Sequence, residues 1–165
     1  MRRFVLAPTA QNTQNLRWVL LESRERVVQL AELVVAWMRE LPRIDPALDE
    51  AMHAGGLVRA WDRGVDVITR TAPQLAVVVA PQWRWGQPDA IIAATYLELL
   101  AQARGIGCCW GGYLCMAFEH PAAQGVRDFL GLGEGEMAFA AQMMGYPRFK
   151  AHARPPRKNA HITWK

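Results

Sequence analysis

Apolar residues along this chain fall into two kinds of segment, short continuous runs and longer stretches with helical spacing. Residues 16–21 form an apolar and aromatic run after a polar stretch of Gln, Asn and Thr, which predicts a strand, expected in the centre of a sheet. Residues 74–80 lie between two prolines and are rich in β-branched side chains, a pattern typical of a strand buried on both faces with a helix on each side. Residues 105–112 predict a strand that ends in a tight glycine-rich loop, and residues 137–144 predict another apolar strand.

Helical spacing occupies the segments between these runs. Residues 23–42 predict an amphipathic helix that is capped by its first serine and interrupted by its last proline. The helical pattern of residues 46–70 is broken by Gly55-Gly56 and by Gly64, which favours two short helices with a mobile join. Residues 90–103 predict a helix with one face built mainly from small side chains, and two further short helices are expected before the last strand.

Strands that alternate with helices in a chain of this length predict a single α+β domain over residues 1–165, a mixed sheet flanked by helices. Residues 148–165 form a basic, Pro-rich extension that closes with the strand-like tripeptide Ile162-Thr163-Trp164. Such an extension often pairs with another subunit, and a frayed tail is an equal alternative. The small-residue helix, the seven tryptophans and the terminal tripeptide favour a homodimer, although each also fits a core.

Composition is that of a folded globular chain, with 52% apolar and 21% charged residues. The longest apolar runs are too short to cross a bilayer, and the apolar part of the first residues is too short for a signal peptide, so we expect no membrane partner and a cytoplasmic location. The three cysteines, Cys108, Cys109 and Cys115, have no distant Cys/His pair, which favours free thiols over disulfides or metal ligands.

The net charge of +4 is concentrated at the two ends of the chain. Clustered basic residues can hold nucleic acid, a membrane surface or a single phosphate, or can be a solvated tail. Aromatic residues do not interleave with the basic ones, so the pattern does not favour a nucleic-acid partner. The basic residues of the ends are Arg2, Arg3, Arg148, Lys150, Arg154, Arg157, Lys158 and Lys165.

Familiar nucleotide and nucleophile motifs are missing from the sequence. Gly105 and Gly107 follow a predicted helix instead of opening one, and no Gly-Lys-Ser/Thr occurs, which disfavours the dinucleotide and Walker modes of binding. Cys109 and His120 could form a thiol nucleophile and its base, but apolar surroundings raise a thiol pKa and no third partner is evident.

Short hydroxyl and amide side chains crowd residues 7–15, just before the first predicted strand. This segment can be an ordinary capped loop. It can also bind the edge of a planar ring, because amides and hydroxyls both donate and accept hydrogen bonds, as the N3, O2 and O4 edge of a flavin requires.

The same loop resembles a known motif. It is similar to the Pro-Ser-x-x-Asn-x-Gln-Pro segment of the FMN-dependent nitroreductase family, with Thr9 in the Ser position and with Asn12 and Gln14 matching. Asn15 replaces the second Pro. Other segments resemble this family in order and at suitable spacing, and together they cover nearly the whole chain. They are Trp18, the helix from Asp89, the loop 105–112, Gly131-Leu132 with Glu134, Gly145-Tyr146-Pro147, and the basic segment 154–158 before residues 162–164.

The resemblance implies a nitroreductase-like homodimer with exchanged C-terminal segments and an FMN held between its two subunits. FMN would take electrons from a reduced nicotinamide or another donor and pass them to an electron-poor, small aromatic acceptor, with the hydride chemistry at flavin N5 and no catalytic acid or base from the protein. The residues expected at the cofactor are Pro8, Thr9, Ala10, Asn12, Gln14, Trp110, Gly111 and Gly112 near its ring and ribityl chain, and Arg157 and Lys158 at its phosphate.

This chain departs from the pattern of the family in one feature. Family members usually carry a helix and an Arg-Arg-Ser-x-Arg motif before the Pro-Ser loop, and residues 1–4 resemble that motif only faintly. We therefore expect the basic C-terminal segment to hold the phosphate, with FMN weakened at least about tenfold by the loss of one or two charge-assisted contacts. A flavin-free or non-catalytic dimer that binds another planar ligand is the alternative.

Overall fold

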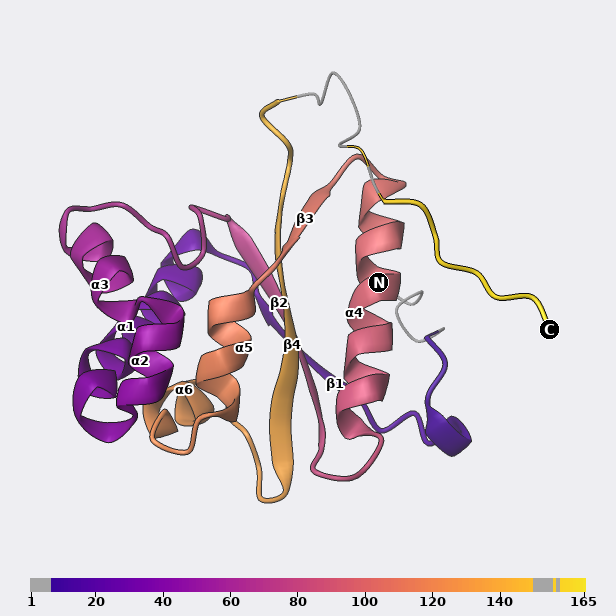
Figure 1. Ribbon diagram of the computed structural model, residues 1–165, viewed down its shortest axis with the longest axis horizontal. Coiled ribbons are helices and arrows are strands. Elements are labelled where there is room, and N and C mark those ends of the chain that lie inside the picture. Colours follow the sequence, from indigo (N-terminus) through magenta and orange to yellow (C-terminus); the bar gives the residue numbers. More distant parts are fainter. Residues whose placement is uncertain (1–6, 150–155, 157) are drawn as a thin grey trace.

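The computed structural model describes residues 7–149, residue 156 and residues 158–165. Its centre is one antiparallel sheet of four strands in the order β1-β2-β4-β3. Helix α4 covers one face of the sheet, and the other helices gather on the opposite face (Figure 1). The strands are β1 Arg17–Leu21, β2 Gln74–Pro81, β3 Gly107–Trp110 and β4 Glu136–Gly145; the helices are α1 Arg24–Ile44, α2 Pro46–Met52, α3 Ala54–Asp62, α4 Gly86–Gln102, α5 Gly112–Glu119 and α6 Gln124–Phe129, with the 3₁₀ turn η2 Ala10–Asn12. The α+β class expected from the sequence is confirmed.

Strand β2 is buried on both faces, as its apolar run predicts. Leu75, Val77 and Val79 pack into the larger core formed with α1 and α5, whereas Val78 packs against the alanines of α4. Strand β1 exists as expected, but its predicted place in the sheet centre is wrong, because it pairs with β2 and forms one edge of the sheet. An apolar run reports that the faces of a strand are covered, and it carries no information on whether both backbone edges are paired.

Two predicted helix boundaries differ from the structure. Helix α1 begins after Ser23, whose Oγ accepts a hydrogen bond from the Arg26 N–H, but it continues beyond Pro42. Pro42 lacks the N–H that would bond to the preceding turn, but it lies in the last turn, and the helix ends two residues later at Ile44. The join between α2 and α3 falls at His53, which adopts a left-handed φ of 52°, and not at Gly55-Gly56, which lie inside α3.

The remaining elements follow the expectations closely. Helix α4 starts at Gly86, a few residues earlier than predicted, and β3, α5, α6 and β4 appear in the expected order. Residues 158–165 have no regular secondary structure, and each is exposed. The strand expected at Ile162-Thr163-Trp164 is therefore not formed within one chain. Among the described residues, no helix combines the length and apolar character that crossing a bilayer would require.

Candidate functional site

The loop of residues 7–15 is tied to the first turns of α4. The backbone N–H of Ala10 donates a hydrogen bond of 2.9 Å to Oδ1 of Asp89. Asp89 is only 2% exposed, and its other oxygen, Oδ2, has no hydrogen-bond partner among the residues that the structure describes. A carboxylate buried beside alanines therefore fixes the position of a loop that lies far away in sequence. In the sequence, Asp89 stands out only as the start of the predicted helix.

Hydrogen bonds inside the loop set its conformation. Oγ1 of Thr9 accepts from the Gln14 N–H at 3.0 Å, and Nε2 of Gln14 donates to Oδ1 of Asn12, also at 3.0 Å. Asn12 and Gln14 have positive φ angles of 53° and 50°, conformations that asparagine tolerates better than most residues. Pro8, Asn12 and Gln14 are exposed, and Thr9 and Ala10 are partly exposed. All five loop residues proposed from the sequence thus lie at an accessible surface.

The second candidate segment, residues 110–112, forms the junction between β3 and α5. The indole of Trp110 is 41% exposed. Gly111 is required by packing, because a Cβ there would lie 2.9 Å from Cδ1 of Leu114 and 3.2 Å from Cβ of Ala141. Gly112 is different, since a Cβ there would meet only the Trp110 ring at 3.8 Å. The backbone at Gly112 is therefore open to a close approach from outside.

Within one chain, the loop and the junction stand apart. The loop is bonded to Asp89, whereas Trp110 pairs with Gln142 across the sheet, and Nε2 of Gln142 donates to Glu98 at 3.3 Å. Glu98 comes nine residues after Asp89, which corresponds to ~13 Å along a helix. The structure brings the residues of each segment together but does not bring the two segments into contact with each other.

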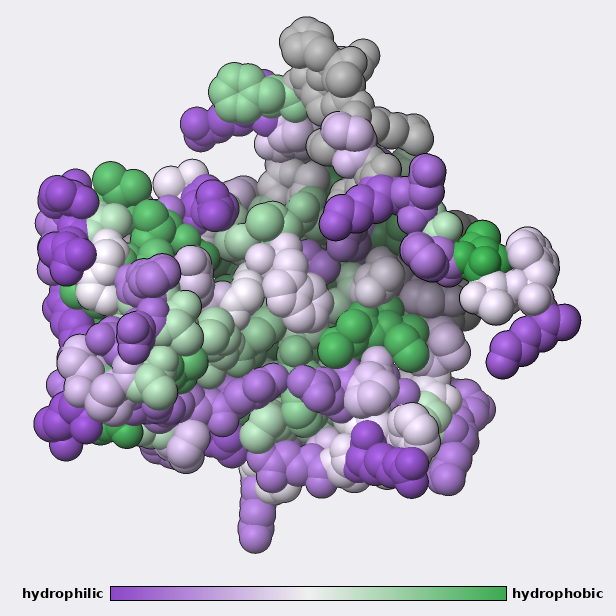
Figure 2. All heavy atoms as spheres, viewed as in Figure 1, coloured by the Kyte–Doolittle hydropathy of each residue, from purple (hydrophilic) through white to green (hydrophobic). Residues whose placement is uncertain are grey.

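Large apolar side chains occupy the outer face of α4. Alanines on its inner face are buried against the sheet, while Ile91, Ile92, Tyr96 and Leu99 remain 38–62% exposed. Figure 2 shows hydrophobic surface in the region of this helix. A contiguous apolar face of this kind is typical of a surface that another molecule covers.

The two phosphate-binding candidates cannot be placed together. Arg157 lies outside the described residues. Lys158 is exposed and makes no hydrogen bond or ion pair with any residue that the structure describes.

Thiol chemistry is not supported at this site. Burial, with smaller effects of Glu98 and Cys109, raises the pKa of Cys108, and burial raises the pKa of Cys115 to about 12. His120, the base considered for Cys109, instead lies against the Trp37 ring, with Nε2 at 3.6 Å from Oδ2 of Asp45. Within the described ranges, no cluster of three or more His, Cys, Asp or Glu side chains could hold a metal ion.

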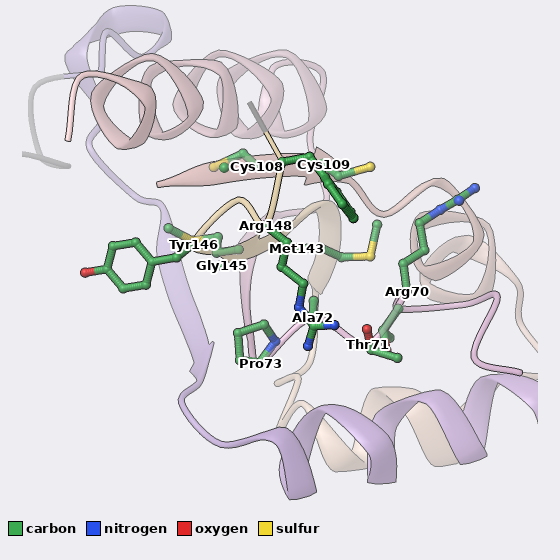
Figure 3. Close-up of a pocket in the computed structure, with 14 residues that line it drawn as sticks. Arg70, Thr71, Ala72, Pro73, Cys108, Cys109, Met143, Gly145, Tyr146 and Arg148 are labelled. Atoms are coloured by element: carbon green, nitrogen blue, oxygen red, sulfur yellow. The ribbon is translucent and has the colours of Figure 1, made fainter. Parts of the chain in front are cut away.

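A pocket of about 680 Å³ opens at the end of the sheet where β3 begins and β4 ends (Figure 3). We call it the sheet-end pocket. It reaches Cys109, the residue before Trp110, so it adjoins the β3–α5 junction. Its lining comes from residues 69–73, 107–109, 143–146, 148 and 149. The sequence alone does not predict this pocket, because its lining segments become neighbours only through strand pairing.

Comparison with solved structures shows the same fold in three flavoproteins. The nitroreductase with bound FMN from Bacteroides fragilis NCTC 9343 has a TM-score of 0.73 at 19% identity, covering 97% of this chain and 81% of that one. The nitroreductase with bound FMN from Desulfitobacterium hafniense DCB-2 has a TM-score of 0.69 at 21% identity, with coverages of 97% and 82%. A mutant of an FMN- and NADPH-dependent nitroreductase from sphigopyxis sp. strain HMH has a TM-score of 0.64 at 19% identity, with coverages of 94% and 80%.

Sequence comparison gives a second, independent finding. No curated protein sequence matches the chain. The model of the nitroreductase family, however, matches residues 2–146, which include all ten helices and strands of the sheet domain. On this match, the chain belongs to the nitroreductase family.

Proposed function

We propose that the chain is an FMN-dependent oxidoreductase that acts as a homodimer. It takes electrons from a reduced nicotinamide or another donor and passes them to an electron-poor organic acceptor. The observation that carries the proposal is the β3–α5 junction, where an exposed indole ring stands beside open backbone at Gly112. Family membership and the FMN-bound structures that share the fold support it.

The junction suits a flavin ring chemically. The first N–H groups of α5, from Gly112 onward, have no acceptor within the helix, and the N-cap Gly111 offers no side chain to them. Flavin N5 and O4 accept hydrogen bonds, so these N–H groups are suitable donors. Neither Trp110 nor the two glycines can act as an acid or base at neutral pH. The flavin would supply the redox chemistry, and the chain would bind and orient it.

A second copy of the chain explains the separation of the two candidate segments. In the proposed dimer, the exposed faces of α4 pack together and the loop 8–14 of one subunit approaches the junction of its partner. Ile162 and Trp164, which are 62% and 88% exposed, then have a partner surface to cover. Arg157 and Lys158 would meet the phosphate of FMN.

Reconstitution with FMN tests the proposal. Purified chain is mixed with excess FMN, passed through gel filtration and examined by visible absorption, with its mass measured by light scattering. We expect a dimer that retains close to one FMN per subunit. A monomer, or a dimer that retains no flavin bands, contradicts the proposal, and the second result favours a flavin-free dimer that binds another planar ligand.

A matched pair of glycine variants locates the flavin. Gly112→Val places a side chain in open space at the junction, and Gly56→Val does the same in α3, where a Cβ would meet only the end of Arg59 at 3.9 Å. Both variants should fold. We expect Gly112→Val to lose FMN and Gly56→Val to bind it like the wild type. Equal binding by both variants would place the ring elsewhere.

A further inference from the structure

Helix α4 carries two carboxylates, Asp89 and Glu98, and no Lys, Arg or His. Neither carboxylate forms an ion pair with any residue that the structure describes. Asp89 is joined to the loop through the N–H of Ala10. Glu98 is joined to Gln142, which pairs with Trp110 of the junction. Each segment that we expect at the flavin is therefore connected to a carboxylate without a cation.

Two amide side chains hold the carboxylate of Glu98 in place. Its Oε1 accepts a hydrogen bond of 3.2 Å from Nε2 of Gln102, and its Oε2 accepts one of 3.3 Å from Nε2 of Gln142. Gln142 is only 1% exposed, and Glu98 is partly exposed. Neutral amides orient a carboxylate without cancelling its charge, and burial reduces the screening of that charge by water and salt. The negative charge of Glu98 therefore acts on groups beside β3.

The thiol of Cys108 shows that this charge reaches β3. Cys108 and Trp110 lie two residues apart on the strand, so their side chains point to the same face of the sheet. Burial raises the pKa of the Cys108 thiol most, and the charge of Glu98 raises it further. Glu98 thus disfavours a second negative charge on this face of β3, close to the junction.

We propose that Glu98 lowers the reduction potential of the flavin bound at the junction, an inference that rests on the proposed function. Hydride transfer from a reduced nicotinamide brings two electrons and one proton to flavin N5. The oxidised nicotinamide is released, and one net negative charge stays on the flavin ring. The carboxylate of Glu98 disfavours that charge, so the reduced flavin passes its electrons to an acceptor more readily. Glu98 acts through its charge and does not touch the reacting atoms.

The size of the effect follows from distance and screening. Trp110 and Gln142 are directly paired, so their Cα atoms lie about 5 Å apart, and the hydrogen bond to Glu98 places the carboxylate roughly 10 Å from a ring at the junction. At an effective dielectric constant of about 20, a unit charge at this distance changes such an equilibrium about 15-fold. Because Glu98 is partly exposed, solvent screening reduces the change to about three- to tenfold, which corresponds to ~15–30 mV for a two-electron couple.

A redox titration of the FMN-loaded chain against reference dyes measures the midpoint potential. We expect Glu98→Gln to raise the potential of bound FMN by ~15–30 mV, the value for a three- to tenfold change, and Glu98→Asp, which keeps the charge, to raise it less. Glu50→Gln is the matched control, because Glu50 is an exposed carboxylate on α2, across the sheet from α4, and its potential should equal that of the wild type. The affinity for oxidised FMN should be the same in all variants, whereas a merely structural role of Glu98 would weaken binding and leave the potential unchanged.

Alkylation of Cys108 tests the charge of Glu98 without any flavin. The chain carries Cys109→Ala in this experiment, and Cys115 reacts poorly because it is buried and its pKa is raised to about 12. The rate of iodoacetamide labelling is measured against pH by peptide mass spectrometry. We expect Glu98→Gln to shift the midpoint of Cys108 labelling to lower pH and Glu50→Gln to leave it in place.

The two measurements separate failure of this inference from failure of the proposed function. Retained FMN with the same midpoint potential in Glu98→Gln and the wild type overturns the inference alone. An unchanged Cys108 titration in Glu98→Gln also overturns it, because the carboxylate would then have no effect even on its neighbouring strand. A chain that retains no FMN contradicts the proposed function, and the inference fails with it.

Discussion

Replacing Asp89 with alanine should release the loop of residues 7–15 without unfolding the domain. The substitution removes the acceptor of the Ala10 N–H, a bond of 2.9 Å that joins residues far apart in sequence. A hydrogen bond to a charged group contributes about 1.5–3 kcal/mol, and about 1.4 kcal/mol corresponds to a tenfold change in an equilibrium. Opening of the loop should therefore become about ten to a hundred times more frequent. The global stability changes less, because the substitution also removes a buried carboxylate with an unpaired oxygen.

Amide hydrogen exchange measures this opening directly. The exchange rate of the Ala10 amide should rise by the same factor in Asp89→Ala, while amides in the central strand, such as that of Val77, keep their rates. Asp89→Asn is the matched control, since its side-chain oxygen can still accept the bond and should limit the increase. If the Ala10 amide exchanges at the wild-type rate in Asp89→Ala, or equally fast in both variants, Asp89 does not hold the loop.

Three further predictions concern the stability of the fold. Gly86→Ala should cost at least about 2 kcal/mol in urea unfolding, because its Cβ would lie 2.2 Å from the backbone oxygen of Pro81; a neutral effect would contradict this packing. Phe118→Ala should cost about 3–5 kcal/mol in the same assay, since the ring is fully buried, and a loss below 1 kcal/mol would show that the core is loosely packed. The hydrogen bond from Arg17 lowers the pKa of Glu136 from its ordinary 4.5, so the stabilisation that the ionised Glu136 gives is present above pH 4.5 and is lost as the pH falls below that value. Glu136→Gln should therefore reduce the fall of the melting temperature at acid pH. An unchanged fall in this variant would refute the prediction.

The secondary structure could be anticipated from the sequence because it follows local rules. The apolar run of β2 and the small-residue face of α4 report burial directly, and both are buried as expected. Positions in the sheet do not follow from such patterns. Strand β1 has the apolar character of a central strand, yet it lies at the edge. The break at His53 was also missed, because a left-handed residue between two helices has no consistent signal when it is not glycine.

The candidate site could be anticipated only in part. The polar loop and the glycine-rich junction stand out in the sequence, since each gathers within a few residues groups that can contact a planar ring. Asp89 and Glu98 do not stand out, because each acts through residues that are distant in the chain. The separation of the loop from the junction, whose contacts on α4 are Asp89 and Glu98, ~13 Å apart along the helix, is likewise a property of the folded sheet and helix, and it leads to the dimer in the proposed function.

The central claim is that the chain, with FMN, catalyses electron transfer to an electron-poor organic acceptor. The most direct measurement is the anaerobic oxidation of NADPH or NADH by a nitroaromatic compound, with FMN present at the concentration of the chain. The account predicts many turnovers per subunit at a rate well above that of the same concentration of free FMN, and loss of this excess rate in Gly112→Val. A rate no higher than that of free FMN with either nicotinamide would contradict it.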